Sequence, residues 1–285
     1  NWVRPAWRWK TANRAPSGKS TRRPQVTELL YRRNALLETM SAGRRKIVRL
    51  LLSHESTPTT NATLVVAAES RAIPIERVPR AEIRQWAGDS AHQDALLEVH
   101  PYPYVGIAEM HARAAGLREA PLLLMLDLLQ SPGNFGRLLR TAEAVGVHGA
   151  LIQKRRAGGV TPAVVAASMG ASEHLLIARV TNLARAIEQL RSDDVWVAGL
   201  DPGAGSHPIS QSDLNRPLAL VVGNEGKGLR RLVRKRCDFL INIPMHGRVQ
   251  SLNAAVAGSL ALYAARNARD PITAAPTIDD SAHPC

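Results

Sequence analysis

The sequence predicts a two-domain α/β protein whose larger, C-terminal domain contains a parallel sheet covered by helices. From about residue 120 onward, apolar runs alternate with amphipathic segments, which is typical of strand–helix–strand units. The apolar runs are almost uninterrupted, as in PLLLMLDLL (121–129), and strands that are buried on both faces have this composition. The prolines in HPYPYVGIAEMHARAAG (100–116) separate this pattern from an earlier α/β unit.

The earlier unit, residues 25–105, is predicted to be a small domain. Its apolar spacing indicates helix 34–41, strand 47–52, helix 59–71, strand 73–78, helix 80–87 and strand 96–99. The segment GRRKIVRLL brings Arg44, Arg45 and Lys46 together. These cations are compatible with phosphate contacts and equally with a solvated strand edge.

The second domain is predicted to cover residues 120–269 and to follow a linker, 106–119. Its expected elements are strand 121–128, helix 135–146, strand 149–153, helix 161–169, strand 174–179, helix 181–191, strands 195–200, 218–222 and 239–243, and helix 251–267. Parallel sheets bind ligands at the carboxyl ends of their strands, so the loops found there are candidate sites.

The chain is basic, with a formal charge of +13, which favours an anionic partner such as nucleic acid. Part of the excess lies in residues 1–24, which lack an apolar period and are predicted to be a disordered arm. That arm suits a solvated or RNA-contacting tail, or else an organelle-type presequence. Residues 270–285 are likewise expected to be disordered.

Cysteine and histidine are placed in a way that argues against disulfides and metal sites. The two cysteines form no paired framework, and no histidine spacing matches a metal-ligand motif. No apolar run approaches the roughly 20 residues that span a bilayer. We therefore expect a cytoplasmic protein with no metal and no membrane segment.

Three segments at strand ends of the second domain carry candidate chemistry. In QSPGNFGRLLRTAEAVG (130–146) a tight turn starts a helix that presents Asn134 and Arg140. Taken alone, this segment is better explained by a capped surface helix with an Arg140–Glu143 ion pair. In LALVVGNEGKGL (218–229) a strand runs into a glycine-rich turn that matches neither a dinucleotide nor a triphosphate loop. In FLINIPMHGRVQSLNAAVAGSLALYAAR (239–266) a Pro-Met turn precedes a long helix, which Ser251 suits as N-cap and whose first turn would hold Asn253.

In this order, the three segments resemble the SpoU/TrmH family of RNA ribose 2′-O-methyltransferases. The matching stretches are NFGRLLRTAEAVG, VVGNEGKGL and IPMHGRVQSLNAAVA, and the resemblance covers residues 120–268 closely. The earlier stretches YRRNALLETMSAGRRKIVRLLL and HQDALLEV resemble that family's ribosomal-protein-like substrate-binding domain. The departures are Ser131, Ala255 and Asp94, of which Asp94 stands where a glycine is common.

The resemblance implies a fold and a cofactor. The second domain would be a SPOUT methyltransferase domain whose C-terminal segment threads into a deep trefoil knot. The bound cofactor would be S-adenosylmethionine. The implied cofactor contacts are Gly223, Asn224, Ile243, Met245, Ser251 and Leu252.

The resemblance also implies an active site. Its implied catalytic residues are Arg140, Asn134, Glu225, Ser251 and Asn253, and its implied RNA contacts are Arg32, Arg33, Arg44, Arg45, Lys46 and Arg140. Arginine stays protonated near neutral pH, so we expect Arg140 mainly to clamp an RNA phosphate, with direct proton abstraction as the alternative. The other four catalytic residues would orient the nucleotide and Arg140.

The expected function is methylation of a ribose 2′-hydroxyl in structured RNA, with a guanosine of 23S ribosomal RNA favoured. One alternative is a transfer-RNA substrate, and another is a non-catalytic RNA-binding or assembly protein on the same fold. By resemblance, we expect a homodimer that packs through the C-terminal domain.

Overall fold

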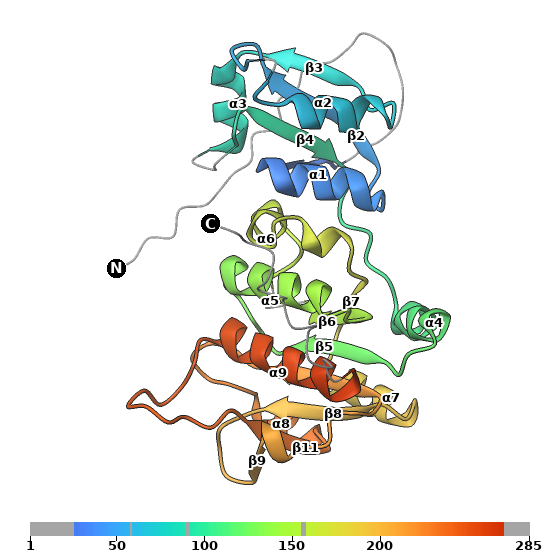
Figure 1. Ribbon diagram of the computed structural model, residues 1–285, viewed down its shortest axis with the longest axis vertical. Coiled ribbons are helices and arrows are strands. Elements are labelled where there is room, and N and C mark those ends of the chain that lie inside the picture. Colours follow the sequence, from blue (N-terminus) through green and yellow to red (C-terminus); the bar gives the residue numbers. More distant parts are fainter. Residues whose placement is uncertain (1–25, 58, 89–91, 155–157, 271–285) are drawn as a thin grey trace, which may run out of the picture.

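The computed structural model describes residues 26–270, apart from residues 58, 89–91 and 155–157. The predicted basic arm and all but the first residue of the predicted tail lie outside the described residues. The described chain forms a four-stranded and a seven-stranded sheet, each with helices packed against it (Figure 1). In the part that the structure describes, no helix is long and apolar enough to cross a membrane.

The N-terminal sheet has the strand order β1-β4-β2-β3, in which only the β2–β3 pair is parallel. Its strands are β1 (Glu28–Leu30), β2 (Ile47–Ser53), β3 (Ile75–Val78) and β4 (Ala95–Val99), and its helices are α1 (Arg33–Ala42), α2 (Ala62–Glu69) and α3 (Arg80–Ala87). Successive residues of β2 point to opposite faces, so Leu50 packs in the cluster with α1 and α2 while Leu51 packs with α3. Both faces of this sheet are therefore covered.

The second sheet is parallel throughout and has the order β7-β6-β5-β10-β8-β11-β9. Its strands are β5 (Leu122–Leu126), β6 (Gly149–Gln153), β7 (Ile177–Val180), β8 (Trp196–Leu200), β9 (Ser206–Pro208), β10 (Leu218–Val222) and β11 (Phe239–Asn242). The helices around it are α4 (Ile107–Leu117), α5 (Pro132–Ala144), α6 (Pro162–Ala167), α7 (Leu183–Ser192), α8 (Arg231–Arg236) and α9 (Ala254–Arg269), with 3₁₀ turns η1 (Ala171–Glu173) and η2 (Ile209–Gln211).

Strand β10 is inserted between two strands that precede it in the chain. The chain runs from β8 outward to β9, returns to the inner side of β8 as β10, and passes outward again to β11. Because the sheet is parallel, the loops that follow β8, β10 and β11 meet at one edge. This interleaved order brings together three segments that are distant in sequence.

The segment 106–119, assigned to a linker from the sequence, is a helix of the second domain's core. In α4, Ile107 and Met110 are buried in the cluster that contains Leu123 and Met125 of β5. A Cβ atom added to Gly149 would lie 2.5 Å from the Met110 sulfur, so a larger residue would require the Met110 side chain to move. The chain therefore enters the second domain at α4.

A buried ion pair joins the two domains. The Arg45 guanidinium binds the Glu173 carboxylate through two hydrogen bonds of 2.8 and 3.0 Å, and both side chains are at most 1% exposed. Burial by itself lowers the pKa of Arg45, but the attraction and hydrogen bonds of Glu173 and Glu28 outweigh it and raise that pKa above its ordinary value. Arg44 donates to the Tyr102 hydroxyl and to the carbonyl oxygens of 103 and 175.

These contacts correct the predicted RNA-binding roles of Arg44 and Arg45. Both guanidiniums are used between the domains, and Arg45 has no surface that a phosphate could reach. Lys46 is exposed and forms no side-chain bond with the described part of the chain. The basic run therefore splits into two cations that hold the domains together and one that faces solvent.

Candidate active site

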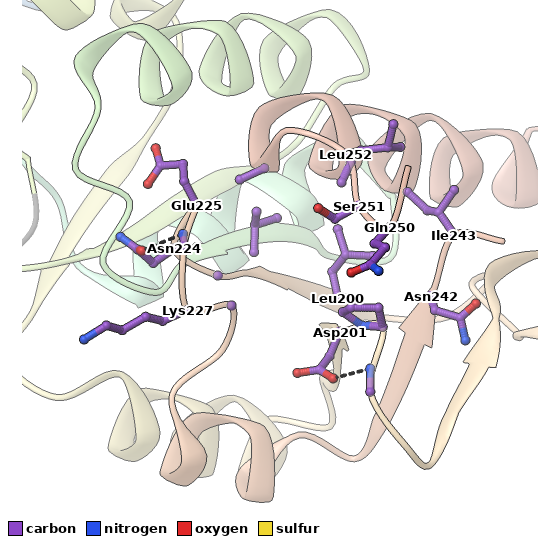
Figure 2. Close-up of a pocket in the computed structure, with 18 of the residues that line it drawn as sticks. Leu200, Asp201, Asn224, Glu225, Lys227, Asn242, Ile243, Gln250, Ser251 and Leu252 are labelled. Carbon is purple, nitrogen blue, oxygen red and sulfur yellow. Dashed lines mark hydrogen bonds between the residues drawn. The ribbon is translucent and has the colours of Figure 1, made fainter. Parts of the chain in front are cut away.

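The carboxyl ends of β8, β10 and β11 enclose a cavity of about 420 Å³ (Figure 2). Its walls are residues 200–203, 222–228 and 250–252, together with Asn242, Ile243, Met245, Ala254 and Ala257. All six predicted cofactor contacts are among them, and so is Glu225. The loops after three separate strands therefore converge on one hollow, as the strand order requires.

The loop 223–228 is held by its own backbone. Asn224 and Gly228 exchange two backbone hydrogen bonds of 3.1 and 3.0 Å, and Gly228 has the left-handed φ of 61°. A Cβ atom on Gly223 would lie 2.3 Å from the carbonyl carbon of Gly228. The loop therefore needs glycine at 223, and it leaves backbone groups exposed to the cavity.

Asn224 stabilises the same loop through its side chain. Its amide group donates to the Leu128 carbonyl oxygen at 2.9 Å, and its side-chain oxygen accepts from the Gly226 N–H at 3.0 Å. Asn224 therefore ties the loop after β10 to the loop after β5. These bonds give it a structural role beside its position on the cavity wall.

The opposite wall comes from the segment between β11 and α9. Ile243, Met245 and Leu252 are partly buried there, and Ser251 is exposed beside them. Apolar side chains that face a glycine-rich loop, whose backbone lines the cavity, suit a ligand with a flat heterocycle and a few polar groups. An adenine ring and a methionine-derived sulfonium are such groups.

A hydrogen-bonded network joins the cavity loop to α5 and α9. The Asn134 amide nitrogen donates to Glu225 Oε1 at 2.9 Å, and the Asn253 amide nitrogen donates to Asn134 Oδ1 at 3.2 Å. Asn134 is 8% exposed, so this network fixes which way its amide points. The structure thus brings together three residues that are 28 to 119 positions apart, as it must if they act on one substrate.

The N-cap of α9 is Asn253, and the prediction that Ser251 caps this helix is wrong. The Asn253 side-chain oxygen accepts from the N–H groups of Ala255 and Val256 at 2.9 and 3.4 Å. Ser251 lies two residues earlier and lines the cavity instead. One asparagine therefore caps the helix with its oxygen and orients Asn134 with its nitrogen.

Arg140 is exposed on α5 and does not line the cavity. It forms no hydrogen bond or ion pair with the described residues, so the Arg140–Glu143 pair of the simpler interpretation is absent among them. The N-terminal cap that this interpretation predicts for α5 is present, since Ser131 Oγ accepts a hydrogen bond from the Asn134 N–H. A guanidinium without a protein partner is available to an external anion.

Arg137 is a neighbour of this network that the sequence analysis did not single out. Its Nη1 donates to Asn134 Oδ1 at 3.3 Å, and its side chain is exposed. The helical spacing to Arg140 is three residues, so both guanidiniums lie on one side of α5. This three-residue spacing is the feature of the sequence that could have indicated Arg137 as a second cation beside Arg140.

The remaining predicted RNA contacts lie in the N-terminal domain. Arg32 is exposed and has a left-handed φ of 73°. The Arg33 guanidinium donates to the Thr60 carbonyl oxygen, and its backbone N–H donates to Gln93 Oε1 at 2.8 Å. Asp94 also has a left-handed φ, 60°, and binds Arg80 at 2.6 Å. An aspartate therefore adopts the left-handed conformation that glycine adopts most readily.

Comparison with known proteins identifies both parts of the chain. The profile of the SpoU rRNA Methylase family matches residues 121–263, and that of the RNA 2′-O ribose methyltransferase substrate-binding domain matches residues 29–105. A TrmH family protein of Bacillus subtilis, YacO, is 41% identical over 87% of this chain and 98% of its own length. The 23S rRNA (guanosine-2′-O-)-methyltransferase RlmB of Pseudomonas putida is 36% identical over 84% of this chain and 95% of its own.

Solved structures confirm the fold. The SpoU methyltransferase AviRb of Streptomyces viridochromogenes superposes with a TM-score of 0.71 at 24% identity, over 85% of this chain and 90% of its own. An AdoMet-bound rRNA methyltransferase of Sinorhizobium meliloti gives a TM-score of 0.70 at 24% identity, over 85% and 87%. The prediction of an α/β methyltransferase fold with a small N-terminal sheet domain is therefore confirmed.

The comparisons also confirm the predicted enzyme class and cofactor, because proteins of this group are methyltransferases that use S-adenosylmethionine. The cavity fits that cofactor in size, in its apolar wall and in the close backbone approach at Gly223. Both family profiles match in chain order, and the two relatives align with this chain over almost their full length. This chain belongs to the SpoU rRNA methylase family.

Proposed function

We propose that this protein methylates a ribose 2′-hydroxyl in structured RNA, with a guanosine of 23S ribosomal RNA as the substrate. The observation that carries the proposal is the bond between Asn134 on α5 and Glu225 on the cavity loop. It couples the wall of the cofactor cavity to a helix that presents an arginine without a partner among the described residues. The name of the 36% identical RlmB supports the choice of ribosomal RNA. An enzyme with that substrate works where ribosomes assemble, in the cytoplasm.

The cofactor would be held by Gly223, Asn224, Ile243, Met245, Ser251 and Leu252. When bound, S-adenosylmethionine supplies a methyl group on a positively charged sulfur. The protein's task is then to place the hydroxyl oxygen near that carbon and to ease the loss of the hydroxyl proton. Backbone groups of the 223–228 loop and the apolar opposite wall keep the cofactor in one position.

Arg140 acts on the RNA as a phosphate clamp. Its guanidinium is exposed and unpaired within the described chain, and its positive charge favours the ionised form of a nearby hydroxyl. The hydroxyl proton would then pass to solvent, and the oxygen would be free to accept the methyl group that bound S-adenosylmethionine supplies. The nucleotide is held by the network of Asn134, Glu225 and Asn253. Their side chains keep amide hydrogens and carboxylate oxygens that are not used within the network and can bond the RNA.

A direct test of the function is methyl transfer from labelled S-adenosylmethionine to 23S ribosomal RNA and to transfer RNA, with mapping of the modified position. We expect a single 2′-O-methylated nucleotide in the ribosomal RNA and none in transfer RNA. Methylation of transfer RNA alone would favour the second substrate. Cofactor binding without methylation of any RNA would favour a non-catalytic RNA-binding protein.

The clamp role is tested by Arg140→Lys, which keeps the charge and loses the two-pronged donor geometry. Loss of one charge-assisted hydrogen bond, about 1.5–3 kcal/mol, predicts a kcat/KM lower by about 10- to 150-fold. Affinity for S-adenosylmethionine should stay the same, because Arg140 does not line the cavity. Near-wild-type turnover would remove the clamp role.

A homodimer through the C-terminal domain is supported by one face of α9. Val256, Leu260 and Tyr263 are each about half exposed and follow helical spacing, which places them on one apolar stripe. Thr141 of α5 bonds Ser259 at 2.8 Å, so the part of α5 next to Arg140 packs beside α9. Leu260→Glu should convert a dimer to a monomer in light scattering, and a wild-type monomer would contradict the assignment.

A further inference from the structure

Six cations on and just before α8 divide into two groups according to their partners. Arg230 binds Asp127 at 2.7 Å, Arg234 lies 3.4 Å from Asp201, and Arg236 binds Glu188 at 2.7 Å. In each case the acid lies on another segment, after β5, after β8 or in α7. These three arginines therefore hold α8 in place, and their charges are neutralised.

The other three cations are Lys227, Arg231 and Lys235. All are exposed, and none forms a hydrogen bond or ion pair through its side chain within the described chain. The acids around α8 offer them no partner, since Asp127, Asp201 and Glu188 bind the first group and Asp238 binds Arg191 at 2.7 Å. Glu225, two residues from Lys227, bonds the neutral Asn134 amide, so the three cations have no acidic partner among the described residues.

The three charges are spaced four residues apart and begin at the cavity. Lys227 belongs to the cavity loop, and Figure 2 shows its side chain pointing away from the hollow. Residues 231 and 235 are one turn apart on α8, so they share a face. The cations thus extend from the mouth of the cofactor cavity along α8.

Helix α8 lies at the end of the molecule opposite the N-terminal domain. The second sheet runs from β7, next to that domain, to β8, β11 and β9, and α8 packs with α7 on this far side (Figure 1). The cavity lies at the carboxyl ends of β8, β10 and β11, and its loop 223–228 leads into α8. RNA that is bound at the cavity can therefore also contact the cations that follow this loop.

We propose that Lys227, Arg231 and Lys235 form a track that binds RNA phosphates on the side of the reacting nucleotide away from the substrate-binding domain. This inference rests on the proposed RNA methyltransferase function and adds a second contact region to it. Charge complementarity identifies the occupant as a phosphate backbone, since the three side chains are exposed cations that have no acidic partner among the described residues. The track contributes affinity and orientation and carries no sequence information.

The test is the salt dependence of RNA binding by the variant Arg231→Gln/Lys235→Gln, whose altered residues lie outside the cavity. The loss of two phosphate contacts makes the negative slope of log K against log salt shallower by about 1.4–1.8. Between 50 and 200 mM salt, the ratio of wild-type to variant affinity should therefore change by about 7- to 12-fold. The unfolding temperature and the affinity for S-adenosylmethionine should not change, because neither side chain has a partner in the described part of the chain.

Arg118→Gln is the matched control. Arg118 is also exposed and without a side-chain partner in the described chain, but it precedes β5, at the opposite edge of the sheet from the cavity. Its loss should leave the salt slope unchanged. If wild type methylates RNA and the double variant keeps the wild-type slope, the track is wrong and the proposed function stands. If wild type binds no RNA, both fail.

Discussion

The buried ion pair between the domains permits a quantitative test of how they are held together. Glu173→Gln removes the carboxylate and keeps the side-chain shape, which leaves the Arg45 guanidinium charged and 0% exposed. Removing one partner of a buried pair costs about 3–5 kcal/mol, because the remaining charge is desolvated without compensation. Arg45 keeps a second partner, Glu28, at 2.7 Å, so the expected loss of stability is at the lower end, about 3 kcal/mol.

The loss converts to a decrease in Tm of about 6–12 °C, measured by circular dichroism without cofactor. Glu38→Gln provides the comparison, since Glu38 binds His174 at 2.8 Å in the same interface but is 47% exposed. An exposed pair contributes about 0.2–1 kcal/mol, so this variant should unfold within about 4 °C of wild type. Equal shifts for the two variants would refute the reasoning, because burial would then have no bearing on the cost.

Three further outcomes follow from single residues. Gly223→Ala should weaken binding of S-adenosylmethionine about 10-fold or more in calorimetry because its Cβ atom would overlap backbone atoms of Gly228, whereas Gly226→Ala, whose Cβ atom meets nothing closer than 3.8 Å, should bind as wild type does. Burial lowers the pKa of His148, so the unfolded chain binds a proton that the folded chain does not as the pH falls below about 6.5. The free energy of unfolding should then decrease by up to about 1.4 kcal/mol per pH unit. Urea titrations at pH 7.5 and 5.5 should show a smaller decrease for His148→Gln than for wild type. Burial raises the pKa of the Cys237 thiol to about 12. In the folded Cys285→Ser variant, where Cys237 is the remaining thiol, we therefore expect no rapid reaction with a thiol reagent at pH 8. Fast labelling would contradict the burial of Cys237.

The regular elements of the second domain were predictable because their signals are local. Strands 149–153 and 218–222 have the predicted ends, since continuous apolar runs bounded by turn residues leave little freedom. The short elements were missed for the converse reason. Strand β9 has three residues and contains a proline, and α8 reads RLVRKR, in which Val233 alone is buried. Contacts with distant segments determine both.

The roles of the arginines could not be read from the sequence. Arg45 lies in a basic run that indicates exposure, and its burial depends on Glu173, 128 residues away. The same limit applies around α8, where three cations are neutralised by acids from three other segments and three are not. A charge count gives the net excess of the chain, whereas only the fold decides which charges remain available to a ligand.

The cap of α9 illustrates how local and distant requirements meet in the candidate site. Ser251 and Asn253 are both good N-cap residues, so helix propensity alone does not choose between them. If Ser251 were the cap, the helix would begin two residues earlier and its backbone would occupy the cavity wall that residues 251 and 252 now form. Starting the helix at Ala254 keeps that wall open and also turns the Asn253 amide toward Asn134. The position of the helix start therefore determines both the cavity and the network beside it, and a change that shifts it should disturb cofactor binding and RNA positioning together.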